Sequence, residues 1–131
     1  MTGADIIGAL LREDPDVIEL VPVARIKGGR LPENIALPAL LVKVVSTVER
    51  QKLKRSGLIR TVDRVSVMVR AGSYEDQRSA MLLARACCAG RTGEVAGAKS
   101  VSILTAGAGP EIDGPGNSFE RTQDFRVSFD A

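Results

Sequence analysis

The carboxylates are the side chains of this sequence that could carry out acid–base chemistry, because the chain contains no histidine. Histidine is the commonest general base and a frequent metal ligand, so its absence removes the usual catalytic triads and imidazole metal sites. Two neighbouring carboxylates could still act as an acid and a base. The acidic candidates are Asp63, Glu75, Asp76, Glu111 and Asp113. Because they are scattered over expected strand, cap and loop positions, with no spacing that selects a pair, we expect them to cap helices or face solvent.

The adjacent cysteines and one glycine-rich segment are equally poor candidates for a reactive site. Cys87 and Cys88 are neighbours on an expected helix, where consecutive side chains point about 100° apart, so we expect packed thiols and no disulfide. Two cysteines without histidine do not form a zinc site. A Gly-Ala-Gly segment at 107–109 follows an expected strand, but Pro110 comes next and no amphipathic helix follows, unlike a dinucleotide loop. The sequence thus predicts no enzyme, no cofactor and no metal.

Positive charge is concentrated in one part of the chain. The formal net charge is only +2, from 18 Lys and Arg against 16 Asp and Glu, so any basic function must be local. Four cations lie in the polar residues 50–57, and three arginines share one side of the strand that follows. These seven residues are Arg50, Lys52, Lys54, Arg55, Arg60, Arg64 and Arg70. They could contact a partner subunit, or DNA phosphates without reading bases. Alternatively, the tip keeps a sheet edge soluble and the arginine-bearing face is solvated.

The bulk composition is that of a folded domain. A chain of 131 residues fits a single domain, 1–131, with one core. Hydrophobic residues make up 44% and charged residues 26%, whereas the aromatic content of 3% is too low for a surface that stacks bases. No apolar run approaches the roughly 20 residues of a membrane-spanning helix, and the N-terminus does not resemble a secretion signal. We therefore expect a cytoplasmic protein, unless it leaves the cell within a larger particle.

Two alternately apolar segments predict a long hairpin. Residues 40–48 and 62–69 are rich in β-branched side chains, which favour a pleated backbone. The polar residues 50–57 between them do not suit a core, so the two segments should form an antiparallel hairpin with a solvated tip. In the second arm, Val65, Val67 and Val69 should face the core, because alternate strand residues point to one side.

Two helices are expected to cover the sheet. The first is capped by Thr2 and ends at Asp14-Pro15, where Asp14 can cap one further short turn. The second starts at Ser73, with Asp76 three residues on, and runs to about Ala89 before a terminating glycine. The expected apolar stripes are Ile6, Ile7, Leu10 and Leu11 in the first helix, and Ala80, Leu83, Ala84 and Cys87 in the second.

The remaining segments complete an α+β fold. Residues 23–26 are expected to form a short strand, residues 101–105 a third main strand, and residues 124–129 a final, cleanly alternating strand. The glycine- and proline-rich residues 106–117 are expected to form a loop that is mobile or ordered by a partner. The expected turn and extended connector are residues 27–30 and 31–38. These elements predict a mostly antiparallel sheet with a long central hairpin and two main helices packed on one face.

This layout resembles the small tail-terminator, or tail-completion, proteins of long-tailed phages and gene transfer agents. The resemblance spans nearly the whole chain and rests on the type and order of its segments. Those segments are the apolar stripe Ile6, Ile7, Leu10 and Leu11, residues 37–39 leading into 40–48, and then residues 65–71, 73–76, 80–84 and 124–129.

The resemblance implies a structural virion protein that forms a hexameric ring at the head-proximal end of the tail tube. Such a ring terminates tail polymerisation and joins the tail to the neck. Its partners would be further copies of itself, the tail-tube protein and a neck or head-closure protein, with non-specific DNA contact in the lumen and no membrane. The protein would be located at the tail–neck junction of the virion, and in the host cytoplasm during assembly. Alternatives are another head–tail connector, a small nucleic-acid-binding module that uses the basic tip, or an enzyme of unknown class.

Overall fold

One mostly antiparallel sheet organises the computed structural model, which describes residues 1–51, 53, 57 and 59–130. The strand order is β1-β2-β3-β7-β5-β4, and β6 also pairs with β7. Among these strands the β1–β2 pair is parallel and the other pairs are antiparallel. The strands are β1 (Ile26–Gly28), β2 (Ala39–Arg50), β3 (Arg60–Ala71), β4 (Thr92–Val95), β5 (Ala98–Ala108), β6 (Ile112–Gly114) and β7 (Ser118–Asp130). The expected α+β class is confirmed.

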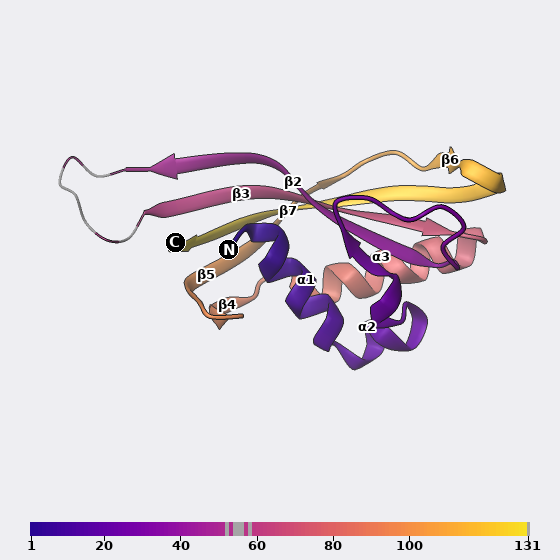
Figure 1. Ribbon diagram of the computed structural model, residues 1–131, viewed down its shortest axis with the longest axis horizontal. Coiled ribbons are helices and arrows are strands. Elements are labelled where there is room, and N and C mark those ends of the chain that lie inside the picture. The colour runs from indigo at the N-terminus through magenta and orange to yellow at the C-terminus, as the bar shows by residue number, and fades with distance from the viewer. Residues whose placement is uncertain (52, 54–56, 58, 131) are drawn as a thin grey trace.

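Three helices lie together below the sheet as it is drawn in Figure 1. They are α1 (Gly3–Glu13), α2 (Pro15–Leu20) and α3 (Tyr74–Cys88). The capping box at the start of α1 is reciprocal: the Asp5 N–H donates to the Thr2 hydroxyl oxygen, and the Thr2 N–H donates to the Asp5 carboxylate. The Asp14 carboxylate then accepts hydrogen bonds from the Asp16 and Val17 N–H groups, so the predicted short second turn is confirmed as α2.

Helix α3 is bounded by the local signals that the sequence contains. The Ser73 hydroxyl accepts a hydrogen bond from the Asp76 N–H at its start, and Gly90 follows its end with a φ of 78°, in the left-handed region that glycine tolerates. The predicted inward stripe is correct except at Leu83, which is only half-buried. The buried residues of α3 are Gln77, Ala80, Met81, Ala84, Cys87 and Cys88.

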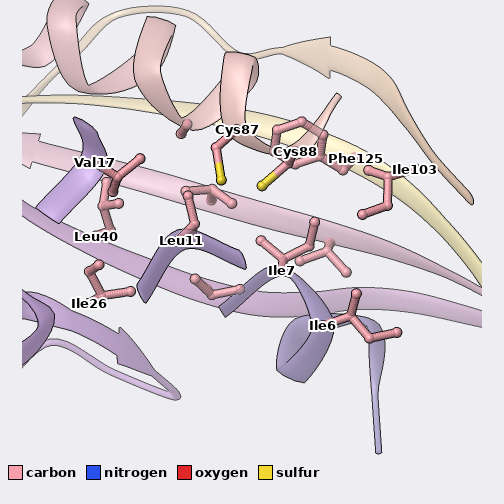
Figure 2. Packing of buried hydrophobic residues seen from close by; sticks show 14 of the residues in the cluster. Ile6, Ile7, Leu11, Val17, Ile26, Leu40, Cys87, Cys88, Ile103 and Phe125 are labelled. Atoms are coloured by element: carbon pink, nitrogen blue, oxygen red, sulfur yellow. The ribbon is translucent and has the colours of Figure 1, made fainter. Parts of the chain in front are cut away.

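The core between helices and sheet is built mainly from aliphatic side chains, as the low aromatic content requires. Val65, Val67 and Val69 of β3 are fully buried, which confirms the predicted alternation of that strand. Phe125 and Phe129 of β7 are the largest fully buried side chains. Figure 2 labels ten residues of this cluster, namely Ile6, Ile7, Leu11, Val17, Ile26, Leu40, Cys87, Cys88, Ile103 and Phe125.

Several expected connections are ordered structure. The predicted strand at 23–26 is a 3-10 helix, Val23–Arg25, and the predicted turn at 27–30 overlaps β1, which pairs with β2. The predicted loop at 106–117 is also wrong. Strand β5 continues into it as far as Ala108, β6 pairs with β7, and a 3-10 helix, Pro115–Asn117, follows. Strand β4 was not expected. Strands of three or four residues are too short to show an alternation, and pairing with distant segments stabilises them.

Strands β3 and β7 lie at the centre of the sheet. β3 pairs with β2 from Arg70↔Ala39 to Arg60↔Arg50, and with β7 from Ala71↔Phe119 to Arg60↔Asp130. In Figure 1 the far end of β2 projects past the end of β7. The residues of the second half of β2, 43–50, are all exposed.

Candidate assembly surface

The second half of β2, residues 43–50, has one unpaired edge within the described part of the chain, because β1 covers β2 only at residues 40–42. All eight residues of this outer β2 edge are exposed. Three of them are valines, Val44, Val45 and Val48, with exposed fractions of 37%, 57% and 58%. A free strand edge that carries apolar side chains can pair with another chain, and natural proteins usually cover or charge such edges.

A buried carboxylate fixes this strand pair to the N-terminal helix. Asp63 on β3 is 2% exposed and accepts hydrogen bonds from the Gly3 N–H at 2.7 Å and the Thr47 hydroxyl at 2.6 Å. Gly3 is the first residue of α1, where backbone N–H groups lack helical acceptors and the helix dipole favours a negative charge. A side chain at Gly3 would place its Cβ 2.8 Å from the Asp63 Cβ, so only glycine fits this approach. The carboxylate therefore has a structural role.

The arginine row that the sequence singled out on β3 is paired with carboxylates of β7. The ion pairs are Arg60–Asp130 at 3.2 Å, Arg64–Asp124 at 2.8 Å and Arg70–Glu120 at 3.0 Å. Each arginine lies opposite or diagonal to its partner in the β3–β7 register. The charge of the arginine row is therefore locally balanced. Candidate contact residue Arg50 is exposed at the end of β2, whereas Lys52, Lys54 and Arg55 lie outside the described residues.

The two cysteines face the core. Both thiols are free, and the Cys87 thiol donates a hydrogen bond to the Leu10 carbonyl oxygen at 3.4 Å. Hydrogen bonding with the Cys87 side chain and burial raise the pKa of Cys88 far above its ordinary value. A thiol that resists ionisation is a poor nucleophile and a poor metal ligand, so Cys88 fills space in the core, and Cys87 is buried beside it.

Two of the surface hollows among the described residues have an arginine side chain in their lining next to the sheet. The larger, about 500 Å³, lies between the connector that precedes β2 and the segment after β6, with Leu31, Ile35, Leu37 and Arg70 in its lining. The smaller, about 170 Å³, lies between α3 and the sheet. The lining of the smaller hollow is Arg78, Met81, Leu82, Arg85, Ala108, Arg121 and Gln123. Arg78, Arg85 and Arg121 are not among the contact residues predicted from the sequence, although Arg78 and Arg85 are spaced seven residues apart on an expected helix.

The described residues contain no group of three or more Cys, Asp or Glu side chains arranged to hold a metal ion. Among the same residues, no helix has both the length and the apolar character needed to cross a bilayer. The hydrogen-bonded carboxylates described above are used as caps, anchors or ion-pair partners.

The fold belongs to the α+β class with a mostly antiparallel sheet, and within the described residues the second half of β2 leaves one strand edge unpaired. No family model matches the sequence, and no curated protein matches it. Among solved structures, the fold is similar to a chain of "Virion of native gene transfer agent (GTA) particle", with a TM-score of 0.79 and 11% sequence identity. The similarity covers 98% of this chain and 95% of that chain, so the two share their fold from end to end.

Proposed function

We propose that this protein is a structural component of a phage-like particle and not an enzyme. The observation that supports this most strongly is the fold similarity, at a TM-score of 0.79 over nearly the whole of both chains, to a chain from a gene transfer agent virion. The surface agrees with an assembling role, because the outer β2 edge leaves three valines in solvent. Asp14, Asp63 and three carboxylates of β7 serve as a cap, an anchor and ion-pair partners, and both thiols are buried, which favours assembly over catalysis.

Within that class, we propose that residues 1–131 form one domain and that six copies form a ring at the head-proximal end of a tail tube. The ring would stop tail polymerisation and join the tail to the neck, with the tail-tube protein and a neck protein as partners. A ring needs two different surfaces on each subunit. The outer β2 edge supplies one, and either hollow could accept a neighbour. Arg50 and the basic residues beyond it would lie near the next ring or the DNA in the lumen.

The test is to locate the chain in particles by electron microscopy. We expect a tagged copy in one ring at the tail–neck junction, and deletion of its gene should leave unjoined heads and tails of uncontrolled length. A ring next to the portal would assign a head-closure role instead. Absence of the chain from purified particles would overturn the proposal.

The outer β2 edge can be tested separately with a matched pair of variants. Replacing Val45 and Val48 by glutamate should leave the monomer folded, because both side chains are more than half exposed, but should prevent oligomers of the 13.9 kDa chain. Leu104→Glu is the control, since Leu104 on β5 is 59% exposed and lies away from this edge. Native mass spectrometry should show oligomers for the control and monomers for the double variant. Identical assembly of both would remove the edge from the ring interface.

A further inference from the structure

The smaller hollow carries positive charge that the rest of the described structure does not balance. Arg78 and Arg85 of α3 are exposed and Arg121 of β7 is half-buried, and all three line the same hollow of about 170 Å³. The ion pairs found among the described residues join β3 to β7 and include none of these three arginines. We call this hollow the arginine cleft.

The arginine cleft combines its cations with an apolar floor. Arg78, Leu82 and Arg85 lie at positions i, i+4 and i+7 of α3, so they form one stripe along the helix. Leu82 is 64% exposed, and Met81 lies beside it in the lining. The opposite wall comes from Ala108, Arg121 and Gln123 where β5 and β7 pair.

Backbone contacts hold the far wall in place. The Arg121 Nε donates to the Gly109 carbonyl oxygen at 3.0 Å, and the Gln123 side chain donates to the Gly107 carbonyl oxygen at 3.1 Å. The remaining nitrogens of the Arg121 guanidinium have no carboxylate partner among the described residues. Glu75 lines the adjacent hollow with Arg78, and no ion pair joins the two in the described structure. The β5–β7 wall of the cleft is therefore held in place by contacts within the chain.

We propose that the arginine cleft binds a segment of a partner protein in which carboxylates flank an aliphatic side chain. Guanidinium groups bind carboxylates through two parallel hydrogen bonds, and the exposed Leu82 between Arg78 and Arg85 offers an aliphatic contact for an apolar side chain. Duplex DNA fits less well, because its phosphates are best met by an extended cationic surface without an apolar centre, and the chain carries a net charge of only +2. This inference rests on the proposed function and deepens it, because it gives the chemistry of one surface through which the subunit meets its neighbours.

The test uses a defined probe, the capped pentapeptide Glu-Leu-Asp-Leu-Glu, titrated into the isotope-labelled full chain by NMR. We expect the amide signals of Leu82, Ala108 and Gln123 to shift, and binding to weaken as salt is added. The double variant Arg78→Gln, Arg85→Gln should lose about tenfold or more in affinity. Its control is Arg126→Gln, because Arg126 is exposed on β7 and forms none of the described ion pairs.

Three results would overturn the inference. The first is that the wild-type chain does not bind the peptide, or binds its amide analogue Gln-Leu-Asn-Leu-Gln equally well. The second is that the double variant binds like the Arg126→Gln control. The third is that a short duplex DNA binds at the same residues more tightly than the peptide does.

Failure of this inference can be distinguished from failure of the proposed function. If the wild-type chain is found at the neck and the double variant enters particles normally, the cleft is not a partner site but the neck role stands. If the chain is absent from particles while the peptide still binds at the cleft, the neck role fails and the cleft remains a peptide site.

Discussion

Replacing Asp63 by asparagine should lower the free energy of unfolding by about 2–3 kcal/mol, because two hydrogen bonds would lose their charged acceptor. The Asp63 carboxylate is 2% exposed and accepts from the Gly3 N–H and the Thr47 hydroxyl. Hydrogen bonds to charged groups contribute about 1.5–3 kcal/mol and neutral ones about 0.5–1.5, so each bond loses about 1–1.5 kcal/mol. The loss is large against a typical stability of about 5–15 kcal/mol.

The assay is urea unfolding followed by circular dichroism, at a concentration where the chain is monomeric. Asp113→Asn is the matched control, because Asp113 on β6 is exposed and its carboxylate has no hydrogen bond among the described residues, so its effect should stay within about 0.5 kcal/mol. A double-mutant cycle with Thr47→Val should assign roughly half of the Asp63 effect to the hydroxyl. An Asp63→Asn variant as stable as Asp113→Asn would refute the view that this carboxylate anchors α1 to the sheet.

Two further substitutions test the core and the caps. Cys88→Ser should cost about 1–3 kcal/mol, because Cys88 is fully buried and a hydroxyl there needs a hydrogen-bond partner; thermal unfolding measures this, and a loss below about 0.5 kcal/mol would contradict it. Asp14→Ala should cost about 1 kcal/mol at neutral pH through loss of the α2 cap. Burial alone would raise the pKa of Asp14, but hydrogen bonds from the backbone N–H groups of Val17 and Asp16, together with nearby Arg91, hold it below the usual 3.8. Because the folded-state pKa is lowered, this stabilisation is present above pH 3.8 and is lost as the pH falls through the folded value. The unfolding free energies of the wild type and Asp14→Ala should therefore converge in acid. A difference that stays constant across that range would show that the charge on Asp14 is irrelevant.

The parts of the fold that depend on residues close together in the sequence could be predicted from the sequence alone. Helix α1 follows from the cap at Thr2 and a helical apolar period, and α2 follows from Asp14-Pro15. The alternation of Val65 to Val69 was enough to predict which side of β3 is buried. These signals act within a few residues, so no distant contact is needed to recognise them.

The short strands β1, β4 and β6 could not be predicted in the same way. Each has three or four residues and is stabilised by a partner strand, as when Ile112 of β6 lies opposite Glu120 of β7. The segment at 106–117 has the composition of a loop, yet its residues Ile112–Gly114 form β6 and pair with β7. Tertiary pairing overrides local preference in such segments.

The sequence by itself determined the cations and the alternation of β3 and β7, because residue type and period are local properties, whereas the uncovered edge of β2 follows from the strand order. Only the tertiary structure decided which cations are balanced. Arg60 and Asp130 are 70 residues apart and become neighbours only in the β3–β7 register. That register is set by burial of the valine and phenylalanine faces, since a shift of one residue would turn them to solvent. The same packing places Arg78 and Arg85 of α3 beside Arg121 of β7, so the unbalanced charge lies in the arginine cleft.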